Sequence, residues 1–487
     1  MEKYEKILVI IISAILALGV VSFLDKTLMA GMLFSLLLGT ATLLFLSKLG
    51  IEDKKITTFF VVVFIIHTAV VVAMHYSNFQ PFANGAGDFV EYHKNAIEIY
   101  TRLQHGNFSV MGLERASHYY PVLIGYIYTF TVPNMLMGQL LNAWLMSLTA
   151  LVSYFIVTAI KGSKKGALLV ATMVAFYPSL LFFGGLMLKD ALIVFLSLLG
   201  ILITIQLIQK FQWGLFALLY LILGFTIHFR FYIGFAVLLT FIISWLLFSN
   251  IYFKKRAMYF LVMVALFGFL PQLFMVDDAG YWGAKLFKQY LNQKTISYYR
   301  ESAYVAEPQY AKNVTTPVVT TSVANQKEPV IIPAALEEED TAGSTFAVKT
   351  EFNNFFKFIG NYIVSFIYTI FGPFVWQIKY KRQLLSLIEV IPWYFLLFFI
   401  VKGAIKEFGR YYKNNYKIYA PLLIFTVLVL SSIALFFNNF GIITRIRIPA
   451  IICLLCFLPF SLKEDSVIYQ YFEKIYSKIS LKWNQKR

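Results

Sequence analysis

A polar stretch of seven residues, GDFVEYH at positions 87–93, contains two carboxylates, a tyrosine and a histidine in a chain rich in Leu, Ile, Phe and Val. A positioned carboxylate can take a proton from a reacting hydroxyl or amine, so Asp88 and Glu91 are candidate general bases. Tyr92 and His93 are possible supporting residues. The same spacing suits the start of a helix, with Asp88 as the N-cap and Glu91 in a capping box. The two interpretations do not exclude each other.

Three further groups of ionisable residues interrupt apolar segments. Charges at such places usually snorkel to the membrane interface or pair locally, and the alternative is that they face a substrate or a cavity. These residues are Lys189 and Asp190 in GGLMLKD, His228 and Arg230 in HFRFY, and Arg445 and Arg447 in IITRIRIPA.

The two arginines of the third group stand two positions apart with apolar residues on both sides. In a helix, Arg445 and Arg447 would point about 200° apart, whereas in an extended segment they would share a face. Pro449 disfavours helix at the preceding residue, which favours the extended arrangement. Arginines without an equal number of neighbouring carboxylates indicate a bound anion. A lipid-linked phosphate or diphosphate fits, because its headgroup lies at this depth in a membrane.

The composition defines the class of protein. Of 487 residues, 59% are hydrophobic and 14% are charged, and the mean hydropathy is +0.70. We therefore expect an all-α fold, a polytopic transmembrane helical bundle of about twelve spans with external loops and interfacial helices. The expected spans are 7–24, 28–47, 57–75, 136–160, 166–184, 187–208, 213–227, 231–249, 257–275, 384–401, 418–437 and 441–461.

The distribution of basic residues predicts the orientation. The positive-inside rule places the basic segments 48–55, 161–165 and 253–256 in the cytoplasm. The loop 76–118, and with it Asp88, then lies on the external face together with the three charged groups described above. The net charge of +17 marks this orientation, so we expect no nucleic-acid partner.

Two apolar stretches do not fit a simple crossing. Residues 119–133 are too short, so we expect an interfacial or half-inserted helix. A full crossing at 353–376 would place the basic stretch 402–417 outside, so this segment is expected to be interfacial or re-entrant. The predicted organisation is an N-terminal transmembrane hairpin (1–56), a transmembrane core (57–276), a long and partly flexible external loop (277–352), a C-terminal transmembrane region (353–462) and a basic cytoplasmic tail (463–487).

Metal chemistry has little support in the sequence. Cys453 and Cys456 lie three apart in an apolar run without a nearby histidine, which is typical of packing residues. The chain has no Asp-x-Asp triplet. Asp277 and Asp278, beside the long loop, are the residues that could contribute to a divalent metal site, and no cofactor is otherwise required.

Several motifs, taken in order, resemble a known family. GD, EYHKNA, YYPVLIGYIY, LLNAWLMSLTALVSYFIV and FYPSLLFFGGLMLKDALIVFLSLL follow one another over roughly residues 75–250, with an echo in RIRIPA. This order resembles the GT-C integral-membrane glycosyltransferases, in particular the family 39-like group of protein O-mannosyltransferases and lipid A aminoarabinose transferases. The N-terminal hairpin before the acidic loop is a departure from many of these relatives.

The resemblance implies a polyprenyl-phosphate-linked sugar donor and a catalytic base at the acidic residue after glycine in the first large external loop. That residue is Asp88 here, with Glu91 as support. Lys189, Arg230, Arg445 and Arg447 are candidates for the donor phosphate by their charge and position. Tyr92, His93, Asp190 and His228 are possible supporting residues.

The expected function is transfer of a sugar from a polyprenyl-phosphate donor to an envelope glycan, lipid or protein acceptor, by a multi-pass protein of the cell membrane with membrane lipids around it. The site is expected on the external or periplasmic side. One alternative is a glycan polymerase or ligase that uses lipid diphosphate-linked oligosaccharide. The other, a flippase or transporter of lipid-linked sugars, would favour inverted repeats and broken helices near the midplane. No clear internal repeat is evident, and the charges lie at the surface, so transport is less favoured.

Overall fold

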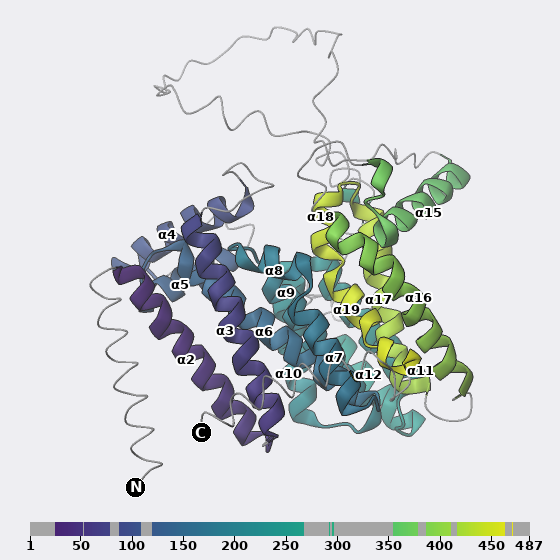
Figure 1. The fold of residues 1–487 in the computed structure, drawn as a ribbon. Coiled ribbons are helices and arrows are strands. Elements are labelled where there is room, and N and C mark those ends of the chain that lie inside the picture. The colour runs from purple at the N-terminus through teal and green to yellow at the C-terminus, as the bar shows by residue number, and fades with distance from the viewer. Residues whose placement is uncertain are drawn as a thin grey trace, which may run out of the picture.

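The computed structural model describes residues 25–51, 53–77, 87–108, 119–266, 292, 295–296, 354–377, 386–410, 416–462 and 470. Every element with defined bounds in these ranges is helical (Figure 1). The fold is therefore an all-α bundle, as predicted. The expected first span, the core of the long loop 277–352 and nearly all of the basic tail 463–487 lie outside the described residues.

Among the described residues, seven helices are long and apolar enough to cross a membrane, and two bent helix pairs raise the number to nine. The prediction of about twelve spans exceeds this number. One predicted span is not described, α10 has only 17 residues, and α12 covers only part of another span. The single helices are α2 (Lys26–Lys48), α3 (Lys54–Ser77), α6 (Met135–Ala159), α9 (Asp190–Gln209), α11 (Phe231–Phe248), α16 (Leu387–Arg410) and α17 (Tyr416–Phe436).

The bent pairs and short helices complete the bundle. The bent pairs are α7 (Lys164–Ala175) with α8 (Pro178–Gly185), and α18 (Phe440–Ile446) with α19 (Ile448–Leu455) and α20 (Leu458–Ser461). The shorter helices are α4 (Asp88–Gln104), α5 (Tyr120–Phe130), α10 (Trp213–Phe229), α12 (Phe253–Leu266), α15 (Phe355–Phe371) and the 3-10 turn η2 (Val375–Gln377).

Helix α6 forms the centre of the bundle and packs against α3, α7 and α9. Most of its residues are buried, including small polar ones. The hydroxyl of Ser147 donates to the carbonyl of Ala143, and that of Thr149 donates to Leu145, so their polar atoms are satisfied within the helix. Small residues allow close approach of neighbouring helices, and Gly184 of α8 lies directly against Met146. A second group of helices, α9, α11 and α17, continues this core.

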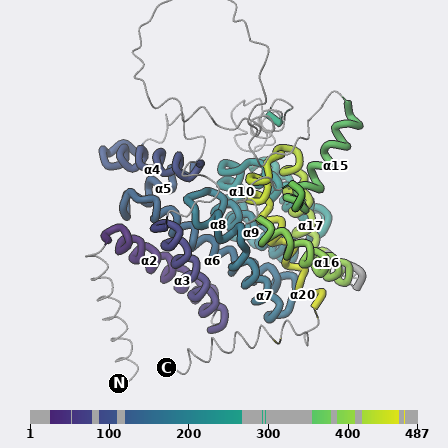
Figure 2. The backbone as a smooth tube through the Cα atoms, turned by 45° about the horizontal axis from the view of Figure 1, so that its top comes forward, coloured from purple at the N-terminus to yellow at the C-terminus, as the bar shows by residue number. Residues whose placement is uncertain are grey.

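Helices α4 and α5 lie together at one end of the bundle, near the top of Figure 1, and Figure 2 shows the same pairing from a second angle. One side of α4 is buried, with Phe89, Tyr92 and Ala96 at helical spacing. Helix α5 approaches closely because Gly125 has no side chain to meet Ile99. With 11 residues, α5 is too short to cross a membrane, in agreement with the sequence.

The start of α4 differs from the prediction. The N-cap is Gly87, whose φ of 143° is a conformation that glycine adopts easily, and Asp88 is the first residue of the helix. The side chain of Asp88 makes no capping hydrogen bond. Because Gly87 is the N-cap, Glu91 also stands one position too late for a capping box. The capping interpretation is therefore wrong, and the carboxylate of Asp88 is directed to another partner.

Helix α15 packs against α17 and lies at the same end of the molecule as α18 (Figure 1). It has 17 residues and covers most of the segment 353–376. That this segment is interfacial or re-entrant stays a prediction.

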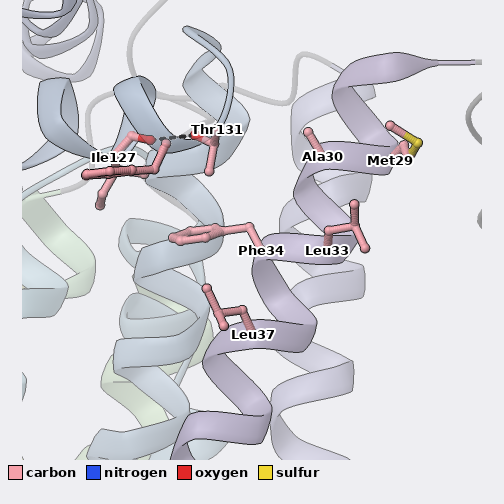
Figure 3. Close-up of a pocket in the computed structure, with 8 residues that line it drawn as sticks. Met29, Ala30, Leu33, Phe34, Leu37, Ile127 and Thr131 are labelled. Carbon is pink, nitrogen blue, oxygen red and sulfur yellow. Dashed lines mark hydrogen bonds between the residues drawn. The ribbon is translucent and has the colours of Figure 1, made fainter.

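An apolar groove of about 490 Å³ lies between α2 and α5 (Figure 3). Its one hydroxyl, that of Thr131, donates to the Ile127 carbonyl at 2.7 Å within α5. The groove therefore suits an apolar chain and provides no acid or base. The lining residues are Met29, Ala30, Leu33, Phe34, Leu37, Ile127, Phe130 and Thr131.

Candidate active site

One guanidinium from the C-terminal part of the chain joins two carboxylates from its N-terminal half. Arg445, near the end of α18, lies 3.3 Å (Nη2) and 3.4 Å (Nη1) from Oδ2 of Asp88. Its Nε lies 3.3 Å from Oδ2 of Asp190. The Asp88 side chain is 52% exposed, whereas that of Asp190 is 5% exposed. Arg445 therefore connects an accessible carboxylate with a buried one.

The buried carboxylate has a second arginine partner. Nη1 of Arg230 lies 2.8 Å from Oδ1 of Asp190, and both side chains are buried. Asp190 begins α9, and Arg230 forms the break between α10 and α11. The Arg230 guanidinium also lies 5.8 Å from the centre of the Tyr232 ring, at a distance suited to a cation–π interaction. Two helix ends thus supply the partners that a charge at this depth requires.

Lys189, directly before Asp190, is also buried. Burial, together with the nearby Arg230 guanidinium, lowers its pKa to about 7. With Lys189 protonated, the cluster contains three cations (Lys189, Arg230 and Arg445) and two carboxylates (Asp88 and Asp190). We call these five residues the Asp88–Arg445 cluster. In this protonated state the cluster has one positive charge in excess, which favours binding of an anion at low dielectric.

Two polar residues of α6 hold the segment that leads to Lys189 and Asp190 of this cluster. Neither was predicted from the sequence. Asn142 donates from Nδ2 to the carbonyls of Leu186 and Leu188, at 2.8 Å each. Gln139, one turn earlier, donates to the Gly185 carbonyl at 2.9 Å, and its Oε1 accepts a hydrogen bond from His75 at 2.7 Å. These bonds hold the segment that ends at Lys189. The available signal was two polar side chains at i and i+3 within an apolar span.

The same asparagine also connects to α4. Tyr120 of α5 donates to Oδ1 of Asn142 at 3.1 Å, and its ring packs edge to face against Tyr92, with centroids 5.7 Å apart. Burial, with a further contribution from the Asp88 carboxylate, raises the pKa of Tyr92. Tyr92 is therefore a neutral phenol that supports α4 beside the cluster.

His93 faces α5 instead of the Asp88–Arg445 cluster. Its Nδ1 is hydrogen-bonded to the Tyr128 hydroxyl at 2.8 Å. Burial, together with the nearby His75, lowers the pKa of His93. The imidazole is thus neutral at pH 7 and links α4 to α5.

Two other candidates lie apart from these ion pairs. Glu91 is exposed on α4. His228 donates from Nδ1 to the Gly224 carbonyl of its own helix at 2.7 Å, and its ring packs against Tyr119 at 5.5 Å. Neither residue takes part in an ion pair with the Asp88–Arg445 cluster.

Arg447 points away from Arg445, because the chain is helical on both sides of a 46° bend. The extended arrangement expected from Pro449 is therefore wrong, since proline is tolerated in the first turn of α19. The buried Arg447 guanidinium donates to the carbonyls of Thr369 and Gly372, at 3.1 and 2.7 Å. Its Nη2 lies 3.5 Å from Glu389. Arg447 thus joins α15 to α16, and its phosphate role stays a prediction.

The described residues offer no group of three or more His, Cys, Asp or Glu side chains that could hold a metal ion. Asp277 and Asp278 lie outside the described residues. Cys453 and Cys456 are buried and unbonded to each other, as packing residues are.

A comparison with protein families finds one match, over part of the chain. The family model of dolichyl-phosphate-mannose-protein mannosyltransferases matches residues 107–302. This range includes Lys189, Asp190 and Arg230, but it excludes Asp88 and Arg445. No curated protein matches the chain. This match, together with the all-helical fold and its candidate membrane spans, confirms the predicted resemblance of this part of the chain to the GT-C membrane glycosyltransferases.

Proposed function

We propose that this glycosyltransferase moves a sugar from a polyprenyl-phosphate donor to a hydroxyl of an envelope glycan, lipid or protein, with Asp88 as the general base. The site would face the external side of the cell membrane. The observation that carries the proposal is the Arg445 guanidinium, which connects the accessible carboxylate of Asp88 with the buried Asp190–Arg230 pair.

The cations would receive the donor phosphate. Arg445 and Arg230 have fixed positions because both are paired with Asp190, so little side-chain entropy remains to be lost on binding. As the bond between the sugar and the phosphate breaks, negative charge increases on the leaving phosphate. Guanidinium groups close to the leaving phosphate stabilise this charge.

Donor binding would also release the base. In the ligand-free protein, Asp88 is paired with Arg445. A phosphate that binds Arg445 competes with this pair, which is partly exposed and therefore weak. Asp88 is then free to take the proton of the acceptor hydroxyl. The acceptor oxygen forms a bond to C1 of the sugar, and polyprenyl phosphate leaves with the electron pair of the broken C1–O bond.

The first prediction concerns the base. Replacement Asp88→Asn should reduce sugar transfer by about 10²–10⁴-fold, because an amide cannot accept the proton. Donor affinity should be equal to or higher than that of the wild type, because Arg445 loses a competing carboxylate. Transfer of labelled sugar from polyprenyl-phosphate hexoses to membrane material, and donor binding to the purified protein, measure the two effects.

The matched control is Glu98→Gln, which changes an exposed carboxylate of the same helix that pairs with Arg102 at 2.7 Å. It should leave both transfer and binding unchanged. Full transfer activity in Asp88→Asn would exclude Asp88 as the base. If the protein is instead a transporter and the carboxylate only lines its path, Asp88→Asn should keep the transport activity. The variant therefore separates the two classes of function.

A further inference from the structure

A fully buried asparagine lies between the elements that present the two arginines of the site. Asn438 connects α17 to α18. Within the described part of the chain, neither its Nδ2 nor its Oδ1 has a hydrogen-bond partner. Buried amides without partners are rare in folded proteins because they lose their bonds to water and gain none, so such a group calls for a functional explanation.

The chain neighbours of Asn438 connect it to the two arginine-bearing parts of the Asp88–Arg445 cluster. Phe437, the preceding residue, packs edge to face on Tyr232 with ring centroids 5.3 Å apart. Tyr232 is the ring beneath the Arg230 guanidinium. On the other side, Asn439 caps α18, and Arg445 is in the last turn of that helix. The amide therefore sits in the segment that joins the Arg230 side of the site to the Arg445 side.

We propose that Asn438 is a sugar-binding residue that recognises hydroxyls of the transferred sugar while Arg230 and Arg445 hold its phosphate. The inference rests on the proposed function. A carboxamide offers two N–H donors and a carbonyl acceptor, a combination that matches neighbouring hydroxyls of a sugar ring. It carries no charge, so it adds recognition of a neutral sugar to a site whose cations are already provided.

Burial of the amide is consistent with this role. The side chains of Arg230 and Asp190 are also buried, and that of Arg445 is 16% exposed, so the site is largely closed without a ligand. The donor must open it to reach either the cations or the amide. The amide has no partner among the described protein groups and would gain the sugar hydroxyls as partners in the complex, as expected for a group kept for binding and not for stability.

The test compares two lipids, polyprenyl phosphate and the polyprenyl-phosphate hexose that the wild type binds most tightly among the mannose, glucose and galactose forms. Replacement Asn438→Leu keeps the number and branching of the side-chain heavy atoms and removes the amide. Affinity for the sugar-bearing lipid should fall by about tenfold or more, because discrimination by a hydrogen-bonding site is large. Affinity for polyprenyl phosphate should stay unchanged. The melting temperature of the free protein should be equal or higher, since an unsatisfied group is removed.

The control is Ser244→Ala. It removes a different buried polar group, a hydroxyl, that also has no hydrogen-bond partner among the described residues. Ser244 lies 13 positions beyond Phe231 in α11, about 20 Å along the helix axis from the Arg230 end. It should leave both affinities unchanged. Asn438→Ala serves as a second variant that cannot overpack the site, and it should show the same selective loss.

Three outcomes would overturn the inference. Unchanged affinity for the sugar-bearing lipid in both Asn438 variants would show that the amide does not contact the sugar. An equal loss for both lipids would assign the residue to the phosphate or to the architecture of the site. A lower melting temperature with normal affinities would reveal a structural role. If the wild type binds neither lipid, the proposed function itself fails. In the three outcomes above, the wild type binds the lipids and only the role of Asn438 fails, so the two failures are distinguishable.

Discussion

At the scale of single residues, the two aspartates of the Asp88–Arg445 cluster have the same charge and different environments. Asp88 forms a partly exposed pair with Arg445, whereas Asp190 is buried and contacts both Arg230 and Arg445. Exposed pairs contribute about 0–1 kcal/mol, so Asp88 can exchange its partner easily. A buried pair loses far more when one member is removed, because the remaining charge stays desolvated. The first aspartate is suited to chemistry and the second to positioning.

This difference predicts the effect of Asp190→Asn. The buried Arg230 guanidinium would lose its carboxylate and Arg445 would keep only Asp88, so the free energy of unfolding should fall by about 3–5 kcal/mol. Thermal or denaturant unfolding of the purified protein measures this, and donor affinity should fall with it. Asp53→Asn is the control, since Asp53 lies 4.0 Å from Lys164 in an exposed pair. A stability of Asp190→Asn equal to that of the control would contradict the positioning role.

At the scale of helices, α6 relates the two sides of the site to each other. Asn142 binds the carbonyls of Leu186 and Leu188 on the side of Lys189, and it accepts a hydrogen bond from Tyr120 on the side of α4. One fully buried side chain thus connects α5, which packs on the helix that carries Asp88, with the segment that leads to Lys189 and Asp190. Catalytic groups positioned in this way lose activity when the support is displaced by a small distance.

Replacement Asn142→Leu should therefore lower kcat/KM more than its effect on folding alone explains. It leaves two buried carbonyls without donors, at about 1–3 kcal/mol each in the free energy of unfolding. Ser147→Ala, on the same helix, removes a hydroxyl that donates only to the Ala143 carbonyl. Its kcat/KM should match the wild type. The positioning role is excluded if Asn142→Leu, assayed well below its melting temperature, keeps the wild-type kcat/KM.

At the scale of the whole molecule, the candidate site and the basic loop at 161–164 belong to opposite ends of the bundle. Helix α6 runs from the α4–α5 end to this loop, and Lys164 lies beside Asp53 at the start of α3. Figure 1 shows the turn between α2 and α3 far from α4. By the positive-inside rule, we propose that this loop lies in the cytoplasm and Asp88 outside.

Cysteine labelling in intact cells tests this orientation. Glu91→Cys and Lys164→Cys place thiols at exposed positions of opposite ends. An impermeant maleimide should label Glu91→Cys in intact cells, and it should label Lys164→Cys only after permeabilisation. The native chain is the blank, because Cys453 and Cys456 are buried. The reverse pattern would place the site on the cytoplasmic side and exclude an external acceptor.

The sequence by itself determined the membrane class, most of the helices and the positions of charge at their ends. Bilayer thickness sets the length of an apolar span, and a charge inside that span is costly, so both features are visible in local sequence. The predicted spans 28–47, 57–75, 136–160 and 231–249 all correspond to helices. Asp88, Asp190, Arg230 and Arg445, selected by type and position, lie in one cluster of ion pairs.

Only the tertiary structure decided which charges are partners. Asp88 and Arg445 are 357 positions apart, and no local pattern relates them. Arg447 stands two residues from Arg445 but binds α15 and α16, because a helical turn directs neighbouring side chains to different faces. The roles of Asn142 and Asn438 also depend on what packs around them. In the sequence, an amide in an apolar stretch gives no indication of whether its hydrogen-bond partners are present.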